Sequence, residues 1–77
     1  TGENGAHELL ALGFRHTGGV SIHELKELGY RLDPDHMTST GMVKLTHGRL
    51  IPDEKGMLFA DTLALKAASH LEELPGV

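Results

Sequence analysis

Cysteine is absent from this sequence of 77 residues. Without it the chain cannot form a disulfide, use a thiolate nucleophile, or hold zinc or an iron–sulfur cluster through sulfur ligands. A secreted domain of this size would usually need disulfides for stability, so we expect a reducing, cytoplasmic location. The sequence also lacks an apolar run long enough to span a bilayer and a signal-peptide pattern at its start. We therefore expect no association with membranes.

A surplus of basic residues is also missing, because 7 lysines and arginines stand against 11 acidic residues, for a formal net charge of −4. Proteins that bind nucleic acid usually carry a basic surplus, since neutralising phosphates dominates their affinity. The composition therefore disfavours a nucleic-acid partner. A chain this short fits one domain, which buries only about 60% of the surface of its unfolded state. We expect a thin core and no deep catalytic pocket.

The clearest start of a helix lies just before residue 22. Ser21 can cap the helix, and Glu24 three residues later completes a capping box. Val20 and Leu25 have the spacing of a hydrophobic staple. These signals predict a helix over residues 22–28.

Two short runs that alternate apolar and polar residues flank His47-Gly48, which predicts a β-hairpin with strands over 42–46 and 49–52. Side chains alternate along a strand, so we expect one core-facing set: Val43, Leu45 and Leu50. Lys44 and Ile51 fall on the opposite face. Methionine and tyrosine suit contact surfaces, and the candidates for a partner surface are therefore Tyr30, Met37, Met42, Lys44 and Ile51. The alternative is that these residues complete the thin core.

The remaining predicted elements are helices, over residues 4–12, 34–40 and 57–74. The last of them depends on apolar residues that recur every four positions, namely Phe59, Leu63, Ala67 and Leu71. Helices joined by a tight turn and followed by a hairpin form a winged helix-turn-helix arrangement. The sequence thus predicts a single α+β domain of winged-helix-like architecture over residues 1–77.

A family resemblance is carried by three parts of the chain: Glu8-Leu-Leu-Ala-Leu-Gly-Phe-Arg15; Gly19-Val20 before a short helix; and Gly41-Met-Val with Gly48-Arg-Leu and Lys55-Gly-Met-Leu-Phe-Ala-Asp61. Together they resemble the C-terminal domain of oxygen-independent coproporphyrinogen III oxidases of the HemN type and their radical SAM relatives. The resemblance extends from Glu8 to Ala68. At one point the chain departs from the family pattern, because Ile51-Pro52-Asp53 stands where the family usually has Leu-Thr.

In that family the chemistry belongs to a separate barrel domain, whose Cys-x₃-Cys-x₂-Cys motif holds a 4Fe–4S cluster that cleaves S-adenosylmethionine. This chain has no cysteine, so the resemblance transfers no catalytic or cofactor-binding residue to it. The resemblance implies an accessory domain at the C-terminus of a larger protein. Such a domain packs beside the barrel of the same polypeptide and helps to shape the site for a porphyrin substrate or haem.

Six histidines are the most suggestive chemical feature: His7, His16, His23, His36, His47 and His70. A metal site needs ligands that converge on one point. The sequence contains neither His-x-His nor His-x₃-His, so we expect scattered surface histidines and no metal site. If one histidine were to ligate haem, the candidates are His16 and His47, since both lie in predicted loops.

Two other functions remain open. The first is a stand-alone winged-helix regulator that binds DNA or another protein, with Arg31, Lys44 and Arg49 as a small basic edge. Asp33 and Asp35 count against DNA, because carboxylates on the second helix of a helix-turn-helix would face phosphates. The second is a small metal- or haem-binding module built on the histidines.

Overall fold

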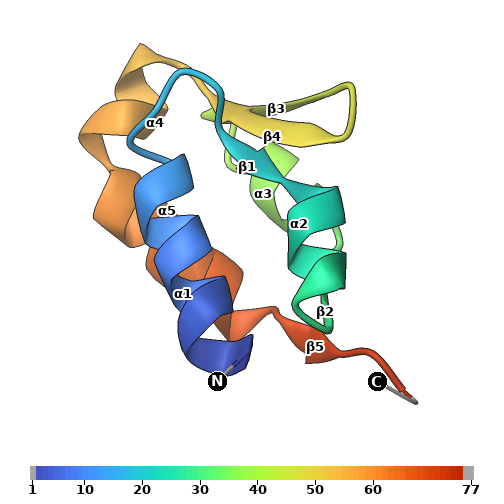
Figure 1. The fold of residues 1–77 in the computed structure, drawn as a ribbon. Helices are drawn as coiled ribbons and strands as arrows, with labels where there is room; N and C mark the ends of the chain where they lie inside the picture. The colour runs from blue at the N-terminus through green and yellow to red at the C-terminus, as the bar shows by residue number, and fades with distance from the viewer. Residues whose placement is uncertain (1, 76–77) are drawn as a thin grey trace.

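The computed structural model describes residues 2–75, which fold into helices and two small antiparallel sheets (Figure 1). The helices are α1 (Gly2–Gly13), α2 (Ile22–Glu27), α3 (Asp35–Thr38), α4 (Glu54–Leu58) and α5 (Ala60–Ser69). The strands are β1 (Val20–Ser21), β2 (Tyr30–Arg31), β3 (Val43–Thr46), β4 (Arg49–Pro52) and β5 (Glu72–Glu73). The predicted α+β class is confirmed.

The predicted hairpin forms in the predicted register, with Thr46 opposite Arg49 and Leu45 opposite Leu50. His47 and Gly48 both have positive φ angles, of 50° and 75°, as a two-residue turn of type I′ requires. Only one member of the predicted core face is misplaced. Val43 and Leu50 are buried, whereas Leu45 is half exposed because it lies near the hairpin tip, beyond the helices.

A third strand completes the larger sheet, whose order is β1-β4-β3. Val20 pairs with Leu50 and Ser21 pairs with Arg49. From α1 to β4 the chain runs helix, strand, helix, a two-residue strand, helix and hairpin, with the early strand β1 beside the hairpin. That is the topology of a winged helix, and the strand at residues 20 and 21 was not predicted.

The predicted Ser21 cap forms. The Ser21 hydroxyl accepts a hydrogen bond from the Glu24 amide at 3.2 Å, and the staple residues Val20 and Leu25 are completely buried. The core lies between α1, α2, α3, α5 and the larger sheet. Its largest fully buried side chains are Phe14, Leu10, Leu25, Leu32, Met37, Leu50, Leu63 and Val20.

The prediction of one helix over residues 57–74 was wrong. Asp53 starts a helix earlier, because its carboxylate accepts a hydrogen bond from the Gly56 amide at 2.7 Å. At Phe59 the backbone leaves helical geometry, with φ −105° and ψ 30°, and this break lets α4 pack on the hairpin while α5 packs along α1. Phe59, the first residue of the four-residue repeat, is about half exposed.

The end of the predicted last helix is instead strand β5. Tyr30 pairs with Glu73 and Arg31 pairs with Glu72, and the two side chains of the second pair form an ion pair at 3.4 Å. The hydrogen bonds of this two-stranded sheet replace the helical ones after Ser69. Helical periodicity could not indicate this exchange, since the partner strand lies about forty residues earlier in the chain.

The predicted helix over 34–40 is shorter than expected and covers Asp35–Thr38. The Thr40 hydroxyl donates to the Met37 carbonyl at 2.7 Å and accepts from the Met42 amide at 3.1 Å. A threonine that bonds to the neighbouring backbone in this way competes with helical hydrogen bonds. The chain therefore turns at Thr40 and enters the hairpin.

Candidate functional site

Two features of this chain differ from those of a winged helix that reads DNA: α3 begins with exposed carboxylates, and the arginines are paired within the fold. Asp33 and Asp35 are exposed at the start of α3, where they would repel phosphates. The three arginines of the sequence all have partners within the fold: Arg15 binds Asp61, Arg31 binds Glu72, and Arg49 donates to the carbonyl of Gly18 at 2.7 Å. Lys44 is exposed on the hairpin. This arrangement of charges disfavours binding in a groove of DNA.

The histidines do not converge on a metal position. Among residues 2–75 there is no group of three or more histidine, aspartate or glutamate side chains placed to hold a metal ion. His16 and His47, the candidates for haem ligation, are both exposed. His23 lies 2.9 Å from Glu27, one turn along α2, which is a surface ion pair when the imidazole is protonated.

Two histidines do meet. The rings of His36 on α3 and His70 after α5 stack with their centroids 3.8 Å apart and their planes 6° from parallel. Parallel rings present their faces to each other, whereas metal coordination needs ring nitrogens directed at one point. The pair therefore joins α3 to the end of α5 and does not form a half-built metal site.

The structure separates the five residues predicted for a partner surface. Lys44 and Ile51 are cross-strand neighbours on the outer face of the hairpin, Lys44 exposed and Ile51 half-buried. Tyr30 and Met42 are half-buried against the core. The surface interpretation is wrong for Met37, which is completely buried and belongs to the core. No single surface unites the five.

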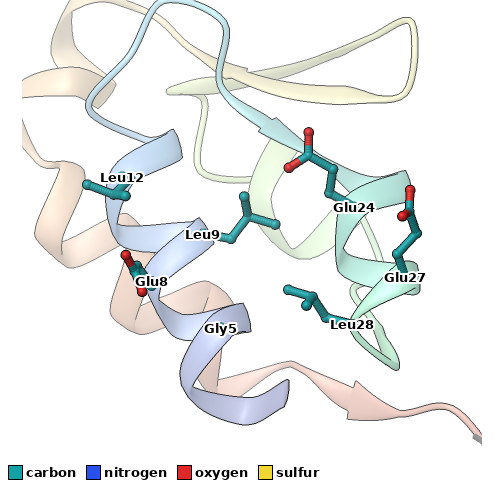
Figure 2. Close-up of a pocket in the computed structure, with 7 residues that line it drawn as sticks. All are labelled: Gly5, Glu8, Leu9, Leu12, Glu24, Glu27 and Leu28. Atoms are coloured by element: carbon teal, nitrogen blue, oxygen red, sulfur yellow. The ribbon is translucent and has the colours of Figure 1, made fainter. Parts of the chain in front are cut away.

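A groove between α1 and α2 was missed by the sequence analysis (Figure 2). Its volume is about 500 Å³, and its lining residues are Gly5, Glu8, Leu9, Leu12, Glu24, Glu27 and Leu28. We call this set the α1–α2 groove. Leu9 and Leu28 point toward each other across it (Figure 2), and Leu12 and Leu28 keep 50% and 37% of their surface exposed. The floor is apolar and the polar lining groups are all carboxylates.

Other exposed apolar side chains lie along α4 and α5. Leu58 at the end of α4 is 83% exposed, Leu65 on α5 is 73% exposed, and Phe59 between the two helices is about half exposed. We call these three residues, two leucines and one phenylalanine, the α4–α5 leucine set. Beside Leu65, a shallow pocket of about 350 Å³ lies between α1 and α5 and is lined by His7, Ala11, Asp61, Ala64, Leu65 and Ala68.

The spacing of exposed leucines on α1 and α5 was the signal available for both regions. Leu12 falls out of phase with the buried Ala6 and Leu10, and Leu65 falls out of phase with the buried Leu63 and Ala67. Apolar residues on the outer side of a helix can mark a surface that another chain covers.

Comparison of the chain with protein-family models, with curated proteins and with solved structures gave no significant match. None of the helices within residues 2–75 is long and apolar enough to cross a bilayer. The features that bear on function are therefore the fold, the charges, the α1–α2 groove and the α4–α5 leucine set.

Proposed function

We propose that this chain is an accessory domain of a HemN-type radical SAM protein, the family that its sequence resembles. In this role it packs beside the catalytic barrel of the same cytoplasmic polypeptide and helps to shape the site for a porphyrin. The iron–sulfur cluster and S-adenosylmethionine would belong to the barrel, since this chain has no cysteine.

The exposure of the α4–α5 leucine set is the observation that carries the proposal. Leu58 and Leu65 hold most of their side-chain surface in water, and covering apolar surface returns about 25 cal/mol for each Å². A domain of 77 residues has little core to offset such exposure. Covering α4 and α5 would therefore favour binding of the partner and also stabilise the folded domain.

The acidic lining of the α1–α2 groove favours an indirect role for the domain over direct binding of the porphyrin. Haem and its precursors carry carboxylate side chains. Within residues 2–75, the lining of the α1–α2 groove contributes Glu8, Glu24 and Glu27 and no basic residue. Like charges in a partly apolar groove repel. The domain would thus act on the substrate site through its position against the barrel.

The proposal can be tested in the full-length polypeptide by hydrogen exchange. We expect amides of residues 54–69 to exchange at least tenfold more slowly there than in the 77-residue chain, because the barrel covers α4 and α5. Leu58→Ser with Leu65→Ser should remove that difference. Leu45→Ser, which changes a half-exposed leucine at the hairpin tip, is the matched control and should leave it intact.

Two results would overturn the proposal. One is a reading frame that encodes no Cys-x₃-Cys-x₂-Cys motif with this domain. The other is equal exchange of residues 54–69 in the long and short chains.

A further inference from the structure

The α1–α2 groove has an apolar lining against which a third helix can pack. Gly5, Leu9 and Leu12 line it from α1, and at 3.6 residues per turn they form one stripe about two turns long. Leu28 lies across from them, near enough that a Cβ at Gly5 would be 3.6 Å from its Cδ2 atom. The absence of a side chain at Gly5 leaves room for Leu28 at this end of the groove. Helices pack by fitting side-chain ridges into such grooves, and Leu9, Leu12 and Leu28 offer the apolar surface for that packing.

The charges around the groove select the kind of helix. Glu24 and Glu27 stand on the α2 side and Glu8 on the α1 side, and no lysine or arginine is among the described residues that line the groove. Figure 2 shows the Glu24 and Glu27 carboxylates projecting at the edge of α2, away from the apolar floor. An apolar floor with an acidic rim complements a helix whose leucines are flanked by lysines or arginines.

The groove lies apart from the face proposed for the barrel. Residues 5, 9 and 12 and residues 7 and 11 project from opposite sides of α1, because successive residues are about 100° apart around a helix. His7 and Ala11 line the pocket beside α5. A body that covers α4 and α5 therefore leaves the α1–α2 groove open to a second molecule.

We infer that the α1–α2 groove binds an amphipathic, basic α-helix supplied by a separate polypeptide. The leucines of that helix would contact Leu9, Leu12 and Leu28, and its flanking lysines or arginines would face Glu8, Glu24 and Glu27. The same rim repels anionic lipids and nucleic acids, so neither is the ligand of this surface. The inference is independent of the proposed barrel contact, because it concerns the other side of α1.

A designed peptide tests this with the 77-residue chain. The probe is a fluorescein-labelled, capped peptide of about 18 residues, long enough to form a helix, with leucines spaced by three and four positions and lysines beside them. Fluorescence anisotropy should show saturable binding with a Kd of about 10–100 μM at low salt. Raising the salt to about 0.5 M should weaken binding several-fold, since exposed charges are then screened. The same peptide with glutamates in place of lysines should not bind.

Two matched pairs of variants locate the site. Leu12→Gln should weaken binding at least about fivefold, whereas Leu65→Gln, which changes a more exposed leucine on α5, should not. Glu24→Gln should weaken binding about two- to threefold, whereas Glu54→Gln on α4 should not. All four positions are exposed. Glutamine at position 24 keeps the backbone amide that bonds to the Ser21 hydroxyl, so each variant should fold.

Circular dichroism of each variant confirms folding before binding is measured. The inference is overturned if the lysine peptide does not bind. It is also overturned if the glutamate peptide binds equally well, or if Leu12→Gln and Leu65→Gln change the Kd alike, since the contact would then lie outside the groove.

Discussion

Gly19 lies so close to strand β4 that a Cβ at this position would come within 2.1 Å of the carbonyl oxygen of Leu50. Its φ angle of +66° is also one that glycine adopts readily and other residues resist. The two conditions together allow β1 to pair with β4. The third strand of the sheet therefore depends on the absence of a side chain at residue 19.

Gly19→Ala should accordingly destabilise the fold by about 3 kcal/mol or more, through left-handed strain and a backbone clash that cannot relax. Gly48→Ala is the matched control, since its φ is +75° but no heavy atom lies within 4 Å of the added Cβ. It should cost about 1–2 kcal/mol. Urea unfolding followed by circular dichroism measures both values, and similar losses would contradict the proposed clash.

Asp53 should prove to be the cap on which the separate helix α4 depends. Asp53→Ala removes the acceptor of the Gly56 amide and should lower the free energy of unfolding by about 1 kcal/mol. Asp53→Ser retains a capping oxygen and should recover most of that loss. If alanine and serine were equally destabilising in thermal unfolding, the hydrogen bond would not be the source of the effect.

The stack of His36 on His70 should contribute a measurable coupling between α3 and the end of α5. Stacked aromatic pairs are worth about 0.5–1.5 kcal/mol beyond the area they bury. A double-mutant cycle with His36→Ala, His70→Ala and both together should give a coupling energy in that range. Additive losses in the cycle would mean that the rings do not support each other in solution.

Leu58→Ser and Leu65→Ser should leave the stability of the 77-residue chain within about 0.5 kcal/mol of the parent value, because both side chains are mostly in water. Leu63→Ser, two residues away and buried, should cost about 2–5 kcal/mol. Chemical unfolding compares the three. A large loss for Leu58 or Leu65 would show that these leucines already have a cover within the chain.

Local signals in the sequence indicated much of the hairpin and of α2. The turn at His47-Gly48 specifies the pairing of residues that lie within a few positions of each other, and the Ser21 cap acts on an amide three residues away. Such contacts depend on short-range geometry, which composition and spacing describe well.

The errors concern choices between competing partners. Residues 72 and 73 have an acceptable helical pattern, yet they pair with a strand some forty positions earlier. Met37 was assigned to a surface, but the burial of a side chain depends on which elements lie opposite it. The α1–α2 groove exists because α1 packs on α5 and the sheet, which leaves its other side uncovered.

The sequence by itself determined the α+β class, the hairpin with its register, the capped start of α2, and the absence of cysteine chemistry. Each of these follows from residue types or near neighbours. Tertiary structure alone decided the break at Phe59, the strands β1, β2 and β5, and the location of the two uncovered apolar regions. Those features arise from the competition of distant segments for the same hydrogen bonds and the same core, and that competition has an outcome only once the chain is folded.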